Sequence, residues 1–77
     1  MKKSTYTEFK DALRDGDIYF VNSFEEAAIW AKHTPDGIEY HVKFKGGSAF
    51  LAEKGSNVVA EAWREHILLT KDEYDNY

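Results

Sequence analysis

The sequence lacks cysteine and has a single proline among its 77 residues. Without cysteine the chain forms no disulfide and offers no thiolate to a metal, which is typical of proteins from a reducing compartment. No stretch approaches the roughly 20 consecutive apolar residues of a transmembrane helix. No apolar run follows Lys2 and Lys3 as it does in a secretory signal. These absences predict a cytoplasmic protein without a membrane anchor.

Basic residues are outnumbered by acidic ones. Ten lysines and arginines stand against 14 aspartates and glutamates, so the net charge is −4. Such a chain repels the phosphate backbone of a nucleic acid at long range unless its basic groups are clustered, which disfavours direct nucleic-acid binding. The length suits one domain. We expect it to comprise an N-terminal helix in residues 1–16, an α/β core in 17–70 and an acidic tail in 71–77.

Side chains that carry catalysis or bind metals are present, but not in the spacings that either function needs. The three histidines, His33, His41 and His66, lack metal-ligand spacing. No serine elbow, phosphate-binding glycine loop or HExxH motif occurs. The adjacent acids Glu25 and Glu26 match the first turn of a helix, where acids stabilise the N-terminus. The sequence therefore predicts no enzyme, no metal site and no cofactor.

Two elements are predicted for residues 18–33. Residues 18–22 are a short run of apolar, β-branched and aromatic side chains, which is typical of a strand. Residues 23–26 read Ser-Phe-Glu-Glu, the pattern of a capping box that opens a helix. The apolar residues that follow the i, i+3, i+4, i+7 spacing of one helix face are Phe24, Ala27, Ala28 and Ala31. We therefore expect a helix here, with Ile29 exposed among charged side chains.

A β-hairpin is predicted for residues 38–53. In its first half apolar and polar residues alternate, which is the period of a strand with one buried face. Two consecutive glycines at its centre suit a two-residue turn. Such a turn would pair Val42 with Leu51 on the core face, and Lys43 with Phe50 on the other face.

Helices are predicted on both sides of this central stretch. Residues 5–8 form a capping box that opens an amphipathic helix ending at Gly16. Residues 58–63 supply the apolar side of a further helix. Residues 67–69 break its periodicity and predict a final strand, with a continuing helix as the alternative. Residues 70–73 match one more capping box, at the start of the acidic tail.

The resulting order is an N-terminal helix followed by β-α-β-β-α-β, the split β-α-β pattern of ferredoxin-like folds. We therefore expect an α+β protein with a four-stranded, mainly antiparallel sheet and both crossover helices on one face. The N-terminal helix either covers the other face or leaves it open. The expected core draws on all these elements and consists of Phe9, Leu13, Ile18, Phe20, Phe24, Ala28, Ala31, Tyr40, Val42, Phe44, Leu51, Val59 and Trp63.

Residues 18–23, Ile-Tyr-Phe-Val-Asn-Ser, resemble the first signature strand of RNA-recognition-motif domains, whose β-α-β-β-α-β order also agrees. The resemblance implies that Tyr19 stacks on a base. The predicted hairpin register places Phe50 on the same open sheet face, beside His41 and Lys43. Aromatic and basic groups on one open face are what single-strand binding uses. The second signature of these domains is largely absent, so single-stranded nucleic-acid binding is the alternative function.

The preferred function is non-catalytic binding to another protein. In size and charge the chain resembles phage- and plasmid-encoded inhibitors such as anti-CRISPR and anti-restriction proteins, which implies a nucleic-acid-processing enzyme as partner. A second copy of the chain is an alternative partner. Acidic groups beside exposed aromatic rings suit such a contact, because they combine steering charge with apolar area. The predicted contact residues are Glu25, Glu26, Ile29, Asp72, Glu73, Tyr74, Asp75 and Tyr77.

Overall fold

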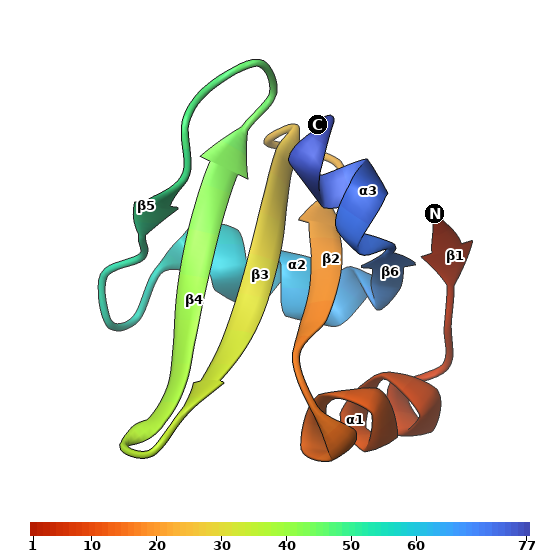
Figure 1. Ribbon diagram of the computed structural model, residues 1–77. Coiled ribbons are helices and arrows are strands. Elements are labelled where there is room, and N and C mark those ends of the chain that lie inside the picture. Colours follow the sequence, from red (N-terminus) through yellow and green to blue (C-terminus); the bar gives the residue numbers. More distant parts are fainter.

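A meander of three antiparallel strands forms the centre of the computed structural model, which describes residues 1–77 (Figure 1). These strands are β2 (Ile18–Asn22), β3 (Ala27–Thr34) and β4 (Gly37–Phe44). Short strands extend the sheet at both edges, namely β1 (Lys2–Lys3), β5 (Phe50–Leu51) and β6 (Ile67–Leu69). The complete sheet has six strands in the order β1-β6-β2-β3-β4-β5, and every neighbouring pair is antiparallel.

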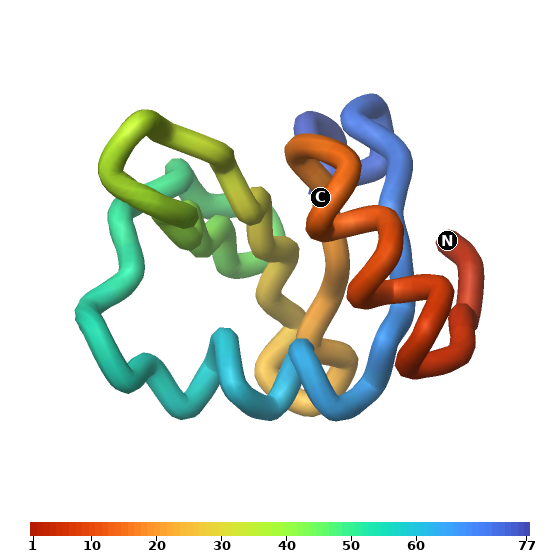
Figure 2. Tube along the Cα trace, turned by 90° about the horizontal axis from the view of Figure 1, so that it is seen from below, coloured from red at the N-terminus to blue at the C-terminus, as the bar shows by residue number.

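Three helices cover the two faces of this sheet unequally. They are α1 (Tyr6–Asp15), α2 (Asn57–Glu65) and α3 (Lys71–Asp75). Figure 1 and Figure 2 show α2 and α3 on opposite sides of the strands. The larger core contains Phe9 of α1 and Val59 of α2, packed with Phe20 and Ile29 of the sheet. On the other face, α3 contributes Tyr74 to a smaller apolar cluster.

The predicted ferredoxin-like fold is wrong, because the sheet has six strands and residues 23–33 contain no helix. Most of that segment is strand β3. Ala27, Ile29 and Ala31 lie in the core shared with α1 and α2, whereas Ala28 and Trp30 face the cluster that contains α3. Because both faces of β3 are covered there, residues 27–31 are a continuous apolar run, and such a run fits the helical period as well as the strand period.

Two side chains consequently lie where the sequence did not place them. Ile29 was expected to be exposed on a helix and has no exposed surface. Phe24 was expected in the core and is 83% exposed in the turn between β2 and β3. The Ser-Phe-Glu-Glu segment makes a turn because the side-chain oxygen of Asn22 accepts hydrogen bonds from the N–H groups of Phe24 and Glu25. These hydrogen bonds to the Asn22 side chain form in place of the predicted capping box of Ser23 and Glu26.

The pairing of β4 with β5 differs from the predicted register by one residue. Phe50 pairs with Val42 and Leu51 pairs with His41. The difference arises because residues 45–49 form a longer loop in place of the expected two-glycine turn. A shift of one residue moves every side chain of a strand to the opposite face. Phe50 therefore lies on the core face of the sheet, and Leu51 lies on the other. The prediction that Leu51 and Phe44 belong to the core is wrong, because they are 57% and 39% exposed.

The local signals at the helix ends are confirmed. The capping boxes predicted at residues 5–8 and 70–73 both form, with each threonine hydroxyl accepting from the glutamate N–H three residues later. Residues 67–69 form a strand, as predicted. None of the three helices is long and apolar enough to cross a membrane.

Replacement of Val42 by aspartate should abolish folding. Val42 is 1% exposed within the larger core, so the variant buries a charge that has no partner. That penalty is a large part of the about 5–15 kcal/mol that stabilises a small domain. Thermal unfolding followed by circular dichroism should show no cooperative transition. Phe44→Asp is the matched control, because Phe44 lies on the same strand and is 39% exposed. An unchanged melting curve for Val42→Asp would contradict this core.

Candidate functional site

The structure brings together three of the eight residues that the sequence proposed as a contact surface, namely Glu25, Glu26 and Tyr77. Glu25 and Glu26 lie in the β2–β3 turn, and Tyr77 ends the chain beside it (Figure 1). Burial raises the pKa of the Tyr77 hydroxyl, and the neighbouring carboxylates of Glu26 and Glu65 raise it further. The carbonyl of Tyr77 also accepts a hydrogen bond from the N–H of Gly46 (3.2 Å). The turn and the C-terminus therefore form one continuous surface.

A buried asparagine fixes the conformation of this turn. Asn22 has no exposed surface, and its side-chain oxygen accepts from the N–H groups of Phe24 (3.1 Å) and Glu25 (3.0 Å). Its side-chain nitrogen donates to the carbonyl of Val58 (3.0 Å) and to a carboxylate oxygen of Glu61 (3.3 Å). Because both halves of the carboxamide are bonded, the turn is held against α2.

Further contacts hold the two ends of the turn. The N–H of Ser23 donates to Glu65 (2.9 Å), and the Ser23 hydroxyl donates to the other oxygen of the same carboxylate. At the far end Glu26 has a φ of 49°, in the left-handed region, and its carbonyl accepts from the N–H of Lys45 (3.0 Å). The ammonium of Lys45 also lies 3.7 Å from the Glu26 carboxylate. The turn is therefore anchored to α2 on one side and to the β4–β5 loop on the other.

Phe24 projects from this anchored turn into solvent and is 83% exposed, the highest value among the large apolar residues. Phe24 lines a shallow hollow of about 410 Å³, which Glu61 and Glu65 also border. Two more acidic residues, Glu25 and Glu26, follow Phe24 in the turn. Lys3 and Arg64 are the basic residues on the rim of that hollow. We call this region the Phe24 turn surface, and it comprises Phe24, Glu25, Glu26, Glu61, Glu65 and Tyr77.

The acidic residues of α3 are largely engaged within the protein. The amine of Met1 donates to Glu73, and that hydrogen bond is the largest cause that lowers the pKa of the Glu73 carboxyl. The Asp75 carboxylate accepts from the ammonium of Lys71 (2.6 Å). Tyr74, which the sequence placed at the surface, is 6% exposed and packs against the sheet. Most of α3 therefore serves to cover the sheet.

The alternative nucleic-acid surface is only partly assembled. Tyr19 and His41 flank Trp30 in one row across β2, β3 and β4, with ring centroids 6.0 and 5.1 Å from Trp30. The Tyr19 and His41 rings each pack against the Trp30 ring, and the ring centroid of Tyr74 lies 5.2 Å from that of Tyr19. The ammonium of Lys43 donates to the carbonyls of Tyr74 (3.2 Å) and Asp75 (2.6 Å). The groups that would stack on bases or bind phosphate are thus already in use.

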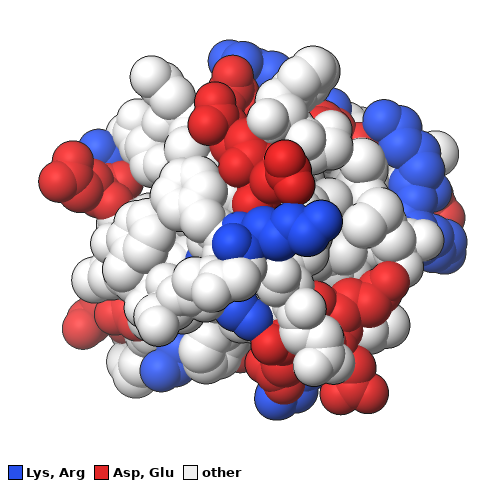
Figure 3. All heavy atoms as spheres, turned by 90° about the horizontal axis from the view of Figure 1, so that it is seen from above, with Lys and Arg blue, Asp and Glu red and all other residues white.

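Two further observations weaken the nucleic-acid alternative. Phe50, the fourth predicted contact, lies on the opposite face of the sheet from Tyr19, because it pairs with the core residue Val42. Figure 3 views the end of the molecule that carries the β2–β3 turn and the C-terminus. Apart from adjoining basic side chains at the right edge of the view, the basic side chains on this end lie between acidic and uncharged ones, so no continuous basic track crosses it.

The fold gathers no group of three or more histidine, aspartate or glutamate side chains that could hold a metal ion. Comparisons with protein-family models, with curated proteins and with solved structures found no match to this chain. The functional assignment therefore depends on the geometry of the surfaces themselves.

Phe24 is the exposed aromatic residue of this surface, and the sequence had placed it in the core. A signal for its exposure existed, because apolar runs lie on both sides of residues 23–26 and an asparagine precedes them. Asparagine commonly opens a turn by accepting from the backbone N–H two residues later. Two strands joined by such a turn place its central side chains in solvent. The capping-box pattern concealed this hairpin, since the same four residues satisfy both interpretations.

Replacement of Asn22 by alanine should loosen the turn and destabilise the protein by about 1–3 kcal/mol, because buried partners are left without hydrogen bonds. Amide exchange of Phe24 and Glu25 should accelerate, which NMR can follow residue by residue. Asn57→Ala is the matched control, since Asn57 is exposed at the start of α2. Unchanged exchange rates in Asn22→Ala would show that the carboxamide does not hold the turn.

Proposed function

We propose that this protein is a binding module without catalytic activity, and that it contacts a partner protein through the Phe24 turn surface. The exposure of Phe24 on a turn held by the buried Asn22 is the observation that carries this proposal. An aromatic ring in water adds nothing to the stability of the free protein, whereas in a complex it becomes a buried anchor. A turn that is already ordered also loses little entropy on binding.

The charges around Phe24 indicate what the partner must offer. Glu25 and Glu26 follow Phe24 in the turn, Glu61 and Glu65 border the adjoining hollow together with Lys3 and Arg64, and the net charge of the whole chain is −4. The complementary surface is an apolar pocket that is flanked by lysine or arginine. Enzymes that process nucleic acids carry such basic surfaces for phosphate groups, and carboxylates can occupy them instead. We therefore favour a nucleic-acid-processing enzyme as the partner, with inhibition or accessory binding as the consequence.

Affinity capture from cells that naturally contain the protein tests this proposal. The tag belongs at the N-terminus, because the C-terminal Tyr77 is part of the Phe24 turn surface. Wild-type protein should retain a partner, and Phe24→Ser should lose it. The purified pair should bind at least about 30-fold more weakly after this substitution, the effect of an interface anchor worth about 2 kcal/mol. Phe50→Ser is the control, since Phe50 is 49% exposed and lies outside this surface.

Reversing the charge of the acidic residues beside Phe24 tests the same proposal independently. Glu25→Lys combined with Glu26→Lys should weaken the complex, and added salt should weaken the wild-type complex, because exposed charges are screened. Recovery of no protein above background would contradict the proposal. A complex that is indifferent to both Phe24→Ser and the charge reversal would contradict it as well.

A further inference from the structure

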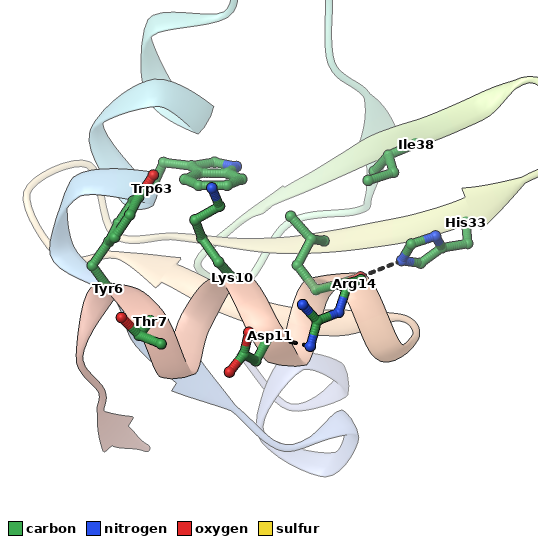
Figure 4. Close-up of a pocket in the computed structure, with 9 residues that line it drawn as sticks. Tyr6, Thr7, Lys10, Asp11, Arg14, His33, Ile38 and Trp63 are labelled. Atoms are coloured by element: carbon green, nitrogen blue, oxygen red, sulfur yellow. Dashed lines mark hydrogen bonds and ion pairs between the residues drawn. The ribbon is translucent and has the colours of Figure 1, made fainter.

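A groove on the side of the sheet that carries α1 and α2 has no part in the proposed function (Figure 4). Two adjoining cavities form it. One of about 570 Å³ lies between α1 and the ends of β3 and β4, and one of about 540 Å³ lies between β4, β5 and α2. Ile38 and Trp63 line both cavities, so the two lie side by side. Each volume falls within the roughly 300–1,000 Å³ that is typical of small-molecule sites.

One end of the groove carries an unpaired positive charge. Lys10 and Arg14 lie one turn apart on α1, and Arg14 is paired with Asp11 at 3.3 Å. Lys10 forms no ion pair, and its ammonium lies 5.2 Å from the centre of the Tyr6 ring. Figure 4 shows the Lys10 side chain reaching toward Trp63, whereas the Arg14 guanidinium turns toward Asp11. The ammonium of Lys10 is therefore free to bind one anionic group.

The middle of the groove is apolar. The indole N–H of Trp63 donates to the hydroxyl of Tyr40 (3.3 Å), and the Phe9 ring packs against the indole with its centroid 4.9 Å away, so the remaining part of the indole lines the groove. Ile38, Tyr40 and Val59 continue this lining toward the second cavity. The side chain of Glu39 lies on the opposite face of β4, where its carboxylate is 3.2 Å from His41, so Glu53 and Lys54 are the charged residues at that far end. The groove thus has an unpaired ammonium at one end and an apolar middle.

We propose that this groove binds a small amphipathic carboxylate. The carboxylate pairs with Lys10, and the apolar body lies along Trp63 and Ile38. A single negative charge matches the unpaired ammonium of Lys10, whereas a doubly charged group would also approach the Asp11 carboxylate, which lines the same cavity.

Trp63 fluorescence gives a direct test, with decanoate as the probe. The chain has two tryptophans, and Trp30→Phe leaves Trp63 as the only reporter. Decanoate below its micellar concentration should change this emission saturably, whereas decyltrimethylammonium, with the same chain and the opposite charge, should bind at least about tenfold more weakly. Lys10→Glu should weaken decanoate binding by a similar factor. Lys32→Glu is the control, because Lys32 lies over Trp30 on the other face.

Three results would overturn the proposal: no saturable change, equal binding of the two probes, or indifference to Lys10→Glu. If Trp30→Phe does not fold, NMR of the wild-type protein replaces it, with the Trp63 indole N–H and the Ile38 methyl groups as reporters. Phe24→Ser should bind decanoate as the wild-type protein does. The groove and the Phe24 turn surface can therefore fail independently of each other.

Discussion

The buried carboxamide of Asn22 determines where β2 ends and β3 begins. Its oxygen accepts from two N–H groups of the turn and its nitrogen donates to α2, so one side chain joins the central hairpin to the helix that covers it. With the turn placed there, Ala27, Ile29 and Ala31 face the larger core and Ala28 faces α3. The same constraint leaves Phe24 in solvent, since it lies between the two strands.

Some signals confined to a few neighbouring residues predicted structure well, whereas the capping-box pattern at residues 23–26, the two-glycine turn and the signals that depend on distant contacts did not. The threonine capping boxes of α1 and α3 need only four residues each. The alanine-rich segment at 27–31 fits a helix or a strand, and only the flanking strands β2 and β4 decide between them. The register of β5 likewise depends on the loop at 45–49, which Gly46 ties to Tyr77 at the end of the chain.

The two proposed binding regions lie at opposite ends of the sheet. The Phe24 turn surface is at the end where β2 passes into β3, and the groove begins where β3 passes into β4 beside α1 (Figure 1). The sequence predicted Glu25, Glu26 and Tyr77 of the first region, but neither Phe24, Glu61 and Glu65 nor the second region. The groove joins side chains from α1, β4 and α2, and no local pattern brings those elements together. Between the two ends, α3 and Tyr74 close much of the face that a nucleic acid would use.

Chemical-shift mapping of the labelled protein with its captured partner, and separately with single-stranded RNA, tests the central claim most directly. The account predicts that the partner perturbs residues 22–26 together with Glu61, Glu65 and Tyr77, and leaves the row of Tyr19, Trp30 and His41 unchanged. RNA at physiological salt should perturb neither region. Perturbations from either ligand that centre on Tyr19, Trp30 and His41 and spare Phe24 would contradict the account.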